Sequence, residues 1–307
     1  MQDHFLTYSF KDKRYTLPCF QLRADTDNGA HVVVSGGMHG DEVNGIYHVR
    51  KFIRWLNEND IKKKMRGRIT ILPILNISGF HNKSRYVTED EADLNRTFGL
   101  VPTKSYSYTL ANVLVEQVFS KATIIVDIHD SGSNNILVPH TRIHISDAEN
   151  CVSCSRELAY IFGLEVNLER KGVKNMLAVH MKSKFNIPVL TVEIGGGQKI
   201  HHEYDDLALQ GLKNILAFSG IIDERVVKPE KQYFVKLRAY YALEEAAVFD
   251  FKIRPGQKVR KGEVVGDLYY PIKQEISPLV SPEDGIIFSM SENNQGSAGE
   301  VIFSVAR

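Results

Sequence analysis

Hydrophobic residues in the first two thirds of the chain form short continuous runs that alternate with segments of helical spacing. The runs are rich in β-branched residues and predict buried strands. They cover 31–37, 68–76, 123–130 and 187–197. Apolar residues at intervals of three and four predict helices. These cover 45–60, 107–122, 173–186 and 205–222. Such alternation is typical of an α/β domain with a largely parallel sheet covered on both faces.

The pattern changes after about residue 225, where helical spacing becomes weak and short β-like runs are separated by turn residues such as Asp284-Gly285. Short strands at regular spacing predict a small all-β domain. We therefore expect a large domain over residues 1–225 and a small β-domain over 226–307, with a linker near 226–232.

Polar residues follow the first predicted strand directly, in the run Gly36-Gly37-Met38-His39-Gly40-Asp41-Glu42. His39 and Glu42 are three residues apart, so both side chains can face one point. A neutral imidazole and a carboxylate are good zinc ligands, and the glycines permit tight turns. The same spacing also occurs by chance, so these two residues alone do not define a metal site.

Two further predicted strands end in ionisable residues. Asp127, His129 and Asp130 end one run, and Glu193 ends another. Ligands bind at the carboxyl ends of strands in such sheets. His129 is a candidate metal ligand whose tautomer an adjacent aspartate would fix, and Glu193 suits a general base that takes a proton from water. The alternatives are a hydrogen-bonded core histidine at 129 and a buried glutamate at 193 that is paired with an arginine.

Arg85 precedes the tetrapeptide Asp93-Leu94-Asn95-Arg96. A guanidinium group can pair with a carboxylate through two hydrogen bonds, and an asparagine amide can add more. A guanidinium group can also stabilise a developing oxyanion. A charged surface loop is the alternative for this segment taken alone.

Together and in this order, four motifs resemble the succinylglutamate desuccinylase/aspartoacylase family of the zinc carboxypeptidase superfamily. The motifs are His39-x-x-Glu42, Asp93-Leu94-Asn95-Arg96, Asp127-Ile128-His129 and Val192-Glu193. The resemblance covers about residues 30–222, and the tetrapeptide is its most specific part. Three further segments are similar to those of bacterial deacylase-like members: Asn76-Ile77-Ser78-Gly79-Phe80, Ser84-Arg85-Tyr86 and Val138-Pro139-His140.

The resemblance implies catalytic roles for five of the matching residues. It implies one zinc ion per chain, bound by His39, Glu42 and His129. Glu193 would be the general base and would also pass a proton to the leaving amine. Arg85 would polarise the scissile carbonyl and stabilise the oxyanion.

Other matching residues are implied to bind the substrate or to support the metal ligands. Asn95 and Arg96 would bind a substrate carboxylate, and Asp93 would hydrogen-bond to a ligating histidine, as we expect of Asp127. The implied fold is a three-layer α/β/α domain like that of zinc carboxypeptidases. It has a mostly parallel mixed sheet and a small C-terminal all-β domain. This last part is similar to a barrel-sandwich domain without a lipoylated or biotinylated lysine motif, so we expect it to serve a structural or pocket-lid role.

We therefore predict zinc-dependent hydrolysis of the amide bond in a small N-acyl amino acid or related N-acyl amine. A zinc carboxypeptidase that acts on a short or modified peptide is one alternative. A catalytically inactive binding protein on the same fold is another. It predicts a missing metal ligand or base, whereas all four of these positions are filled.

Two acidic features depart from the family pattern. Asp130 follows the third implied ligand, where many relatives have threonine or asparagine, and Thr88-Glu89-Asp90-Glu91 precedes the tetrapeptide. A carboxylate near the substrate pocket disfavours an acidic substrate group. We expect both features to act against the succinylated and aspartate-derived substrates of the family.

Charge and composition narrow the expected partners and location. The 307 residues include 38 basic and 37 acidic side chains, with a formal net charge of +1. This balance does not favour a nucleic acid or a membrane as a partner. The polar N-terminus lacks a signal-peptide pattern, and no apolar run is long enough for a membrane span. We expect a cytoplasmic protein with a small-molecule substrate, and the sequence leaves a homo-oligomer open.

Overall fold

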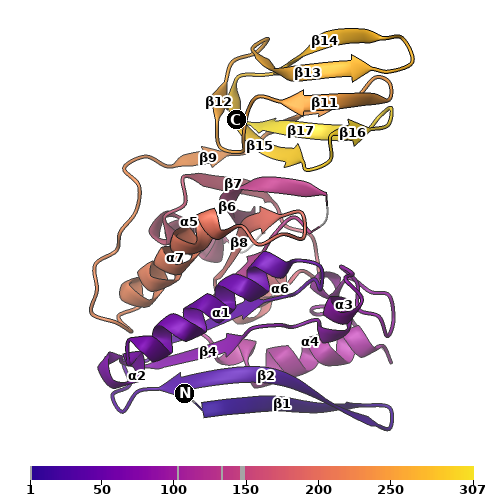
Figure 1. The fold of residues 1–307 in the computed structure, drawn as a ribbon. Helices are drawn as coiled ribbons and strands as arrows, with labels where there is room; N and C mark the ends of the chain where they lie inside the picture. Colours follow the sequence, from indigo (N-terminus) through magenta and orange to yellow (C-terminus); the bar gives the residue numbers. More distant parts are fainter. Residues whose placement is uncertain (1, 102–103, 133, 146–148) are drawn as a thin grey trace.

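A β-sheet flanked by helices forms the larger part of the molecule, and a smaller β-structure is stacked beyond it (Figure 1). The computed structural model describes residues 2–101, 104–132, 134–145 and 149–307. The strands of the larger part are β1 (Gln2–Phe10), β2 (Lys13–Arg23), β3 (His31–Gly36), β4 (Arg68–Leu72), β5 (Ile124–His129), β6 (Asn135–Ile145), β7 (Val166–Lys171) and β8 (Val189–Gly196).

The helices lie in the connections between these strands. They are α1 (Val43–Glu58), α2 (Ile61–Lys64), α3 (Ile77–His81), α4 (Tyr106–Gln117), α5 (Glu149–Phe162), α6 (Leu177–Phe185) and α7 (Asp205–Phe218), with short 3-10 helices η1 (Leu94–Arg96), η2 (Phe119–Lys121) and η3 (His202–Tyr204). None of the described helices combines the length and the apolar composition that crossing a bilayer would require.

The centre of the sheet is parallel, and its edges are not. Strands β4, β3, β5 and β8 are neighbours in this order and run parallel, while β2 and β6 flank them in the antiparallel direction. The sheet is therefore mixed, as expected. The four buried runs predicted as strands are these central ones. The hairpin β1–β2 has no counterpart among the predicted strands, because β2 is buried on one face only and lacks a continuous apolar run.

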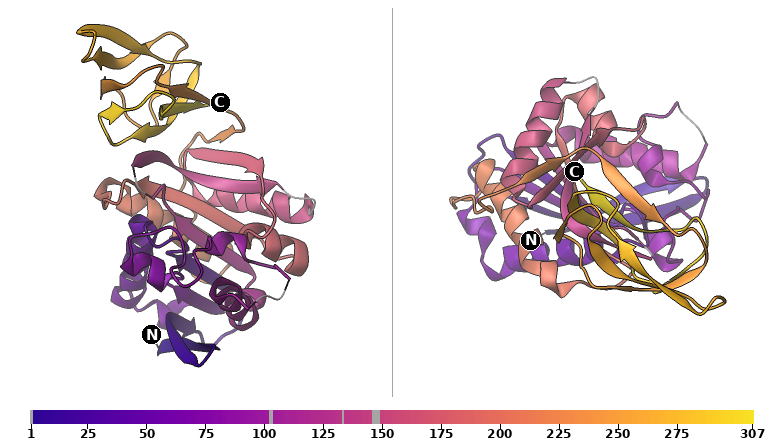
Figure 2. Two further views of the ribbon diagram at one scale, coloured as in Figure 1. Left: turned by 90° about the vertical axis from the view of Figure 1, so that its right-hand side faces the viewer. Right: turned by 90° about the horizontal axis from the view of Figure 1, so that it is seen from above.

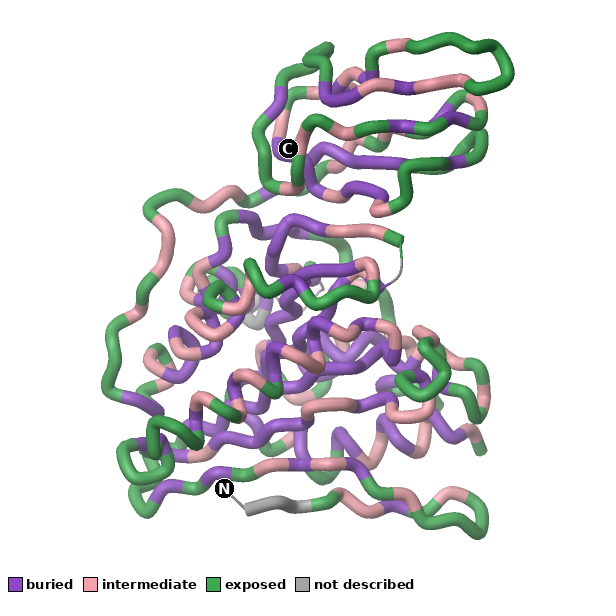
Figure 3. The backbone as a smooth tube through the Cα atoms, in the orientation of Figure 1, coloured by how far each residue is buried: buried purple, intermediate pink, exposed green. Residues whose placement is uncertain are grey.

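Side chains alternate between the two faces of each central strand and build two cores. Val32 and Val34 pack in the core that contains residues of α1, α5 and α7, whereas Val33 packs in the core that contains residues of α4 and α6. Buried residues accordingly dominate the central strands in Figure 3. The result is the expected three-layer α/β/α arrangement.

The C-terminal part is built from strands alone. They are β9 (Tyr233–Val235), β10 (Arg238–Ala242), β11 (Ala247–Phe251), β12 (Lys258–Val259), β13 (Val264–Tyr270), β14 (Glu275–Val280), β15 (Gly285–Ser291), β16 (Gln295–Gly296) and β17 (Val301–Ala306). Residues 219–232, which precede them, form neither helix nor strand, and the range predicted as a linker, 226–232, lies within this segment.

The C-terminal part is joined to the large sheet by hydrogen bonds and by packing. β15 pairs with the beginning of β6, so the large sheet continues from β6 through β15 and β17 to β10. The fully buried ring of Phe288 lies 4.5 Å from that of His140, centroid to centroid. Figure 2 shows the C-terminal part at one end of an elongated molecule. The shared sheet edge fixes where this part sits relative to the ends of the central strands.

The contact between α1 and β5 gives a stability test at Gly45. An alanine is favoured over glycine in a helix interior by about 1 kcal/mol. A Cβ atom at position 45, however, would lie 2.5 Å from the carbonyl oxygen of Ile128. We expect Gly45→Ala to lower the free energy of unfolding by about 1–3 kcal/mol, as overpacking does, measured by urea denaturation. The exposed Arg50→Ala in the same helix is the control, and an unchanged or raised stability of Gly45→Ala would contradict the close contact.

Candidate active site

The carboxyl ends of the central strands bring the ionisable residues of the sequence together. In the parallel pair β5–β8, His129 lies directly beside Glu193, at the interstrand spacing of about 4.8 Å. Both continue the face on which Ile125 and Val189 pack in the core. The loop 37–42 follows β3 at the same edge of the sheet. It places His39 and Glu42 beside His129 and Glu193.

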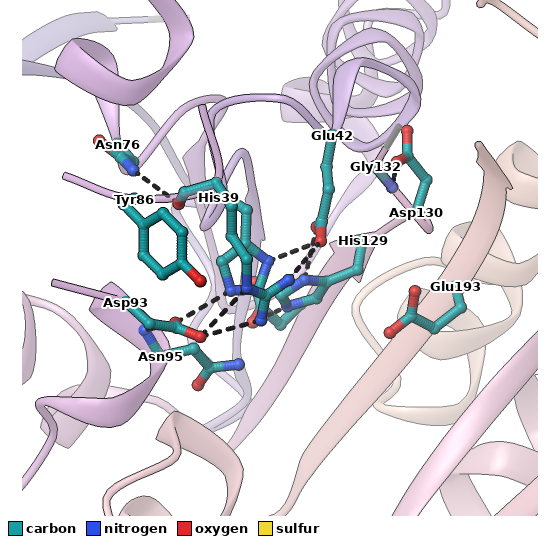
Figure 4. Close-up of polar contacts among 12 residues, drawn as sticks. His39, Glu42, Asn76, Tyr86, Asp93, Asn95, His129, Asp130, Gly132 and Glu193 are labelled. Atoms are coloured by element: carbon teal, nitrogen blue, oxygen red, sulfur yellow. Dashed lines mark hydrogen bonds and ion pairs between the residues drawn. The ribbon is translucent and has the colours of Figure 1, made fainter. Parts of the chain in front are cut away.

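A single carboxylate lies between two imidazole rings at the start of α1. Glu42 Oε1 is 2.6 Å from His39 Nδ1, and Glu42 Oε2 is 2.7 Å from His129 Nδ1 (Figure 4). All three side chains are buried, and one potential ligand atom from each lies within 4.8 Å of the others. The structure thus gathers the three residues expected to bind a metal, although they are up to 90 positions apart in the sequence.

The outer nitrogen of each imidazole is held by an aspartate. His39 Nε2 lies 3.2 Å from Asp93 Oδ1, and His129 Nε2 lies 2.8 Å from Asp127 Oδ2. Ser35 in turn donates to Asp127 at 2.6 Å. Such carboxylates keep a proton on Nε2 and leave Nδ1 to face a metal. Asp93 and Asp127 therefore occupy the supporting positions expected of them.

The donor set fits a zinc ion. Two imidazole nitrogens and one carboxylate oxygen are a common protein contribution to a catalytic zinc site, which keeps a further position open. Burial opposes charge on His39 and His129, but the surrounding carboxylates raise the pKa of both imidazoles. Burial likewise opposes charge on Glu42, yet the two histidines hold its pKa well below the ordinary value. The carboxylates around His39 and His129 therefore favour a positive charge between these residues, and a divalent cation would supply that charge.

Glu193 is both paired with an arginine and open toward the site. Its Oε1 atom lies 2.9 Å from Arg142 Nη1. Its Oε2 atom is buried and has no hydrogen-bond partner among the described residues. Burial raises the pKa of this carboxyl group, while Arg142 acts in the opposite direction. One oxygen of Glu193 is therefore positioned by Arg142, and the other is available to a substrate or a water molecule.

The expected substrate contacts line the same cavity, which has a volume of about 310 Å³. Arg85, Asn95 and Arg96 contribute to its wall together with the three candidate metal ligands and Glu193. Asn95 Oδ1 accepts a hydrogen bond from the backbone N–H of Leu177 at 2.9 Å, which leaves the amide nitrogen of Asn95 for the cavity. Arg85 donates to Asp93 through Nε and Nη2, at 3.2 and 2.9 Å.

Asp130 lines the cavity, and its carboxylate accepts hydrogen bonds from the start of α1 and from the following loop. Its Oδ2 atom accepts from the backbone and side-chain nitrogens of Asn44, at 2.8 and 2.9 Å, and its Oδ1 atom accepts from the N–H of Gly132 at 2.7 Å. Figure 4 shows Asp130 turned toward Gly132. Burial and the nearby Glu42 raise the pKa of Asp130 to about 8. Both oxygens accept hydrogen bonds from neutral donors, and the residue lines the cavity, so the expected repulsion of an acidic substrate stays a prediction.

The acidic segment before the tetrapeptide is also engaged elsewhere. Both carboxylate oxygens of Asp90 accept from Ser107 at the start of α4, at 2.8 and 2.6 Å. Glu89 accepts from Ser78 at 2.6 Å. Neither side chain lines the cavity. These two carboxylates bind loops and a helix end away from the cavity, so for them the geometry does not support the expected effect on specificity.

Comparison with protein families identifies the family of the chain. Residues 28–219 match the model of the succinylglutamate desuccinylase/aspartoacylase catalytic domain. That match covers more than half of the chain. The chain belongs to this family. The resemblance seen in the sequence motifs is thereby confirmed, and membership supports hydrolysis of N-acyl amide bonds.

Individual relatives of the family are distant in sequence but similar over nearly the whole chain. An N-alpha-acetyl-L-2,4-diaminobutyric acid deacetylase from Halomonas elongata is 23% identical over 286 residues, which are 91% of this chain and 82% of that protein. A succinylglutamate desuccinylase/aspartoacylase from Rhodobacter sphaeroides has a TM-score of 0.81 at 22% identity, covering 100% of this chain and 94% of that one. The product-bound ectoine utilization protein EutE (DoeB) from Ruegeria pomeroyi has a TM-score of 0.83 at 20% identity, covering 99% and 94%.

Several cavity residues of this family member were absent from the sequence prediction. Arg142 and His144 come from β6, and Arg238 and Tyr240 come from β10. The apolar run of β6 is short and ends at Pro139, and polar residues then alternate with apolar ones over the part that carries Arg142 and His144. β10 belongs to the C-terminal part, and nothing in its own sequence indicates that it reaches the cavity.

Asp127 gives a test of the metal centre in this family member. Removing a carboxylate that orients a ligating histidine typically weakens metal binding by about 10- to 100-fold. We expect this loss of zinc affinity in Asp127→Asn, measured by competition with a chelator of known affinity. Asp250→Asn, at an exposed position, is the matched control. Equal zinc affinity in both variants would show that Asp127 does not support a metal ligand.

Proposed function

We propose that this protein is a zinc-dependent deacylase that hydrolyses the amide bond of a small N-acyl amino acid or related N-acyl amine. One observation carries the proposal. The unpartnered Oε2 atom of Glu193 and the donor set of His39, Glu42 and His129 face the same small cavity. Activation of water requires a metal ion and a base close to each other. Here His129 and Glu193 lie side by side on neighbouring strands. The family of the chain supports the reaction class.

The residues described next have two tasks, which are to polarise the scissile carbonyl group and to bind the substrate carboxylate. When bound at His39, Glu42 and His129, zinc supplies a Lewis acid for the water and for the substrate carbonyl. Arg85 lies beside this centre, with Nη1 3.6 Å from Glu42 Oε1 and Nη2 bonded to Asp93, and it donates to the carbonyl oxygen as that oxygen becomes negative. The amide nitrogen of Asn95 and the guanidinium group of Arg96 bind the carboxylate of the amino acid.

Glu193 moves the proton. Its Oε2 atom takes a proton from the attacking water, and the same carboxyl group then gives that proton to the amine nitrogen as the C–N bond breaks. Arg142 holds Oε1 at 2.9 Å throughout, which keeps Oε2 directed at the reacting atoms. Burial raises the pKa of Glu193, and a raised pKa makes a carboxylate a better base near neutral pH.

The walls of the cavity favour a small substrate over a peptide. Side chains from β10, β15 and β17 line it together with those of the central strands. Its volume of about 310 Å³ is at the lower end of the range for ligand pockets. The deacetylase from Halomonas elongata is named for a small N-acetyl amino acid. A comparison of N-acyl amino acids with dipeptides as substrates separates the deacylase from a carboxypeptidase.

Glu193→Gln tests the assignment of the base. Glutamine keeps the size of the side chain and an oxygen that can accept from Arg142, but it cannot take a proton. General-base catalysis contributes about 100- to 10,000-fold, so we expect kcat to fall by that factor while one zinc ion per chain is retained. The measurements are steady-state kinetics and metal analysis of the same preparation. Near-normal turnover with zinc present would rule out Glu193 as the base.

Arg142 gives a test through the pH dependence. Glu193 must be ionised to act, so kcat/KM should rise with pH through the pKa of Glu193. Arg142 favours the ionised form and lowers that pKa. We therefore expect Arg142→Met to move the acidic limb of the profile to higher pH, and Arg142→Lys, which keeps the charge, to move it less. A limb that stays in place or moves to lower pH in Arg142→Met would contradict the pairing.

A further inference from the structure

A second cavity, of about 710 Å³, lies where the catalytic region meets the C-terminal β-domain. We call it the interdomain cavity. Its walls come from β6, the end of α5, η3, α7, the segment 227–229 and the loop 254–257 between β11 and β12. No residue of the described ranges lines both this cavity and the one that contains the candidate metal centre. The interdomain cavity is therefore a separate site, and the proposed deacylase function does not use it.

Apolar side chains make up most of the lining of the interdomain cavity. Val138 and Leu164 are buried, and Leu207 of α7 is exposed toward it. Three prolines, whose backbone φ angle is fixed by the ring, stiffen its walls at positions 139, 229 and 255. The volume of the cavity lies within the range of about 300–1,000 Å³ that is typical of small-molecule sites. The cavity thus has the size and the lining of a ligand pocket.

Hydrogen bonds fix the two walls of the cavity that are neither helix nor strand. The amide group of the buried Asn214 donates to the carbonyl oxygens of Phe162 and Val227, at 3.1 and 2.6 Å, and accepts from the N–H of Val227 at 2.9 Å. Two further hydrogen bonds, of 2.8 and 2.9 Å, join the loop 254–257 to the backbone of Ile287 in β15. The cavity is therefore already formed, and a ligand does not have to order its walls on binding.

Positive charge predominates among the ionisable side chains of the interdomain cavity. Arg254 and Lys228 line it, against the single carboxylate of Glu165. The ammonium group of Lys228 lies 3.1 Å from the centroid of the Tyr160 ring. The guanidinium group of Arg254, in contrast, has no ion-pair or hydrogen-bond partner among the described residues. A guanidinium group without a counter-charge at the wall of an apolar cavity favours a ligand with an acidic group.

Tyr204 adds a hydrogen-bond donor near Arg254. Its ring stacks on that of His201, with the centroids 5.9 Å apart, and its hydroxyl group has no hydrogen-bond partner in the described parts of the chain. Burial and the carboxylate of Glu203 raise the pKa of Tyr204, while Arg254 acts in the opposite direction. The protonated hydroxyl group donates, so Tyr204 and Arg254 together suit one acidic group.

We propose that the interdomain cavity binds a small amphipathic anion. The apolar body of this ligand lies against Val138, Leu164 and Leu207, and its acidic group pairs with Arg254 and accepts a hydrogen bond from Tyr204. A small molecule fits better than a protein surface, because several segments of the chain surround a half-enclosed space. The ligand contacts the catalytic region, the connecting segment and the C-terminal domain at once, so it fastens the two domains to each other.

Two fluorescent probes that differ in one acidic group test the charge preference. Anilinonaphthalene sulfonate carries a sulfonate group, and phenylnaphthylamine has the same rings without it. We expect the sulfonate to bind the unmodified protein more tightly than the neutral probe does, measured by fluorescence titration. Arg254→Glu should weaken binding of the sulfonate about 10-fold or more, because it removes a charge-assisted hydrogen bond and adds a like charge. It should leave binding of the neutral probe unchanged.

Arg260→Glu, at an exposed position of the same domain and outside the cavity, is the matched control for the change in charge. It should bind both probes as the unmodified protein does. An Arg254→Glu variant in which both probes are weakened equally, or in which neither is weakened, would overturn the pairing of the acidic group with Arg254. Failure of the unmodified protein to bind the sulfonate would overturn the whole proposal.

Leu207→Trp tests the location of the site. The indole ring fills space in the cavity, so we expect this variant to lose binding of both probes. Leu237→Trp, at an exposed position that does not line the cavity, is the control and should bind both. Unchanged affinity for the sulfonate in Leu207→Trp would show that the probe binds elsewhere and would overturn the proposal. These are binding measurements, so their outcome is independent of whether the chain hydrolyses N-acyl amines.

Discussion

The carboxylate of Glu42, buried between the imidazoles of His39 and His129, is the interaction on which the rest of the site depends. A buried carboxylate is costly unless charge and hydrogen bonds compensate it. Here both oxygens are engaged, at 2.6 and 2.7 Å, and the far side of each imidazole rests on a further carboxylate. The carboxylates on both sides of each imidazole suit a cation at the centre, and they fix the orientation of both rings.

The position of Glu42 depends in turn on where α1 begins. The side chain of Asp130 accepts hydrogen bonds from the backbone N–H of Asn44 and from its amide group, and this binding of the first turn is what a helix N-terminus favours. Gly45 lets the helix approach the end of β5 closely. The residue directly after His129 thus holds the helix that presents Glu42, so the two sides of the metal centre are locked to each other through the backbone.

The C-terminal β-domain forms part of the cavity wall. Pairing between β15 and β6 extends the large sheet past the catalytic strands and carries β10 to the cavity wall. The site is therefore polar and enclosed on one side by a domain that supplies Arg238 and Tyr240. The expectation of a structural or lid role is compatible with this position, and Arg238 places a charged side chain on the cavity wall.

The sequence by itself determined the fold class and the core of the site. The central strands are continuous apolar runs, and a polar residue at the end of such a run, as at His129 or Glu193, stands out because burial would otherwise exclude it. What the tertiary structure decided are interactions between distant segments. The sequence could not reveal that Asp130 binds Asn44, since an acidic residue beside a ligand looks the same whether it faces the cavity or the backbone. Nor could it reveal that Arg238 reaches the cavity, because strand pairing between domains places that residue and leaves no local pattern.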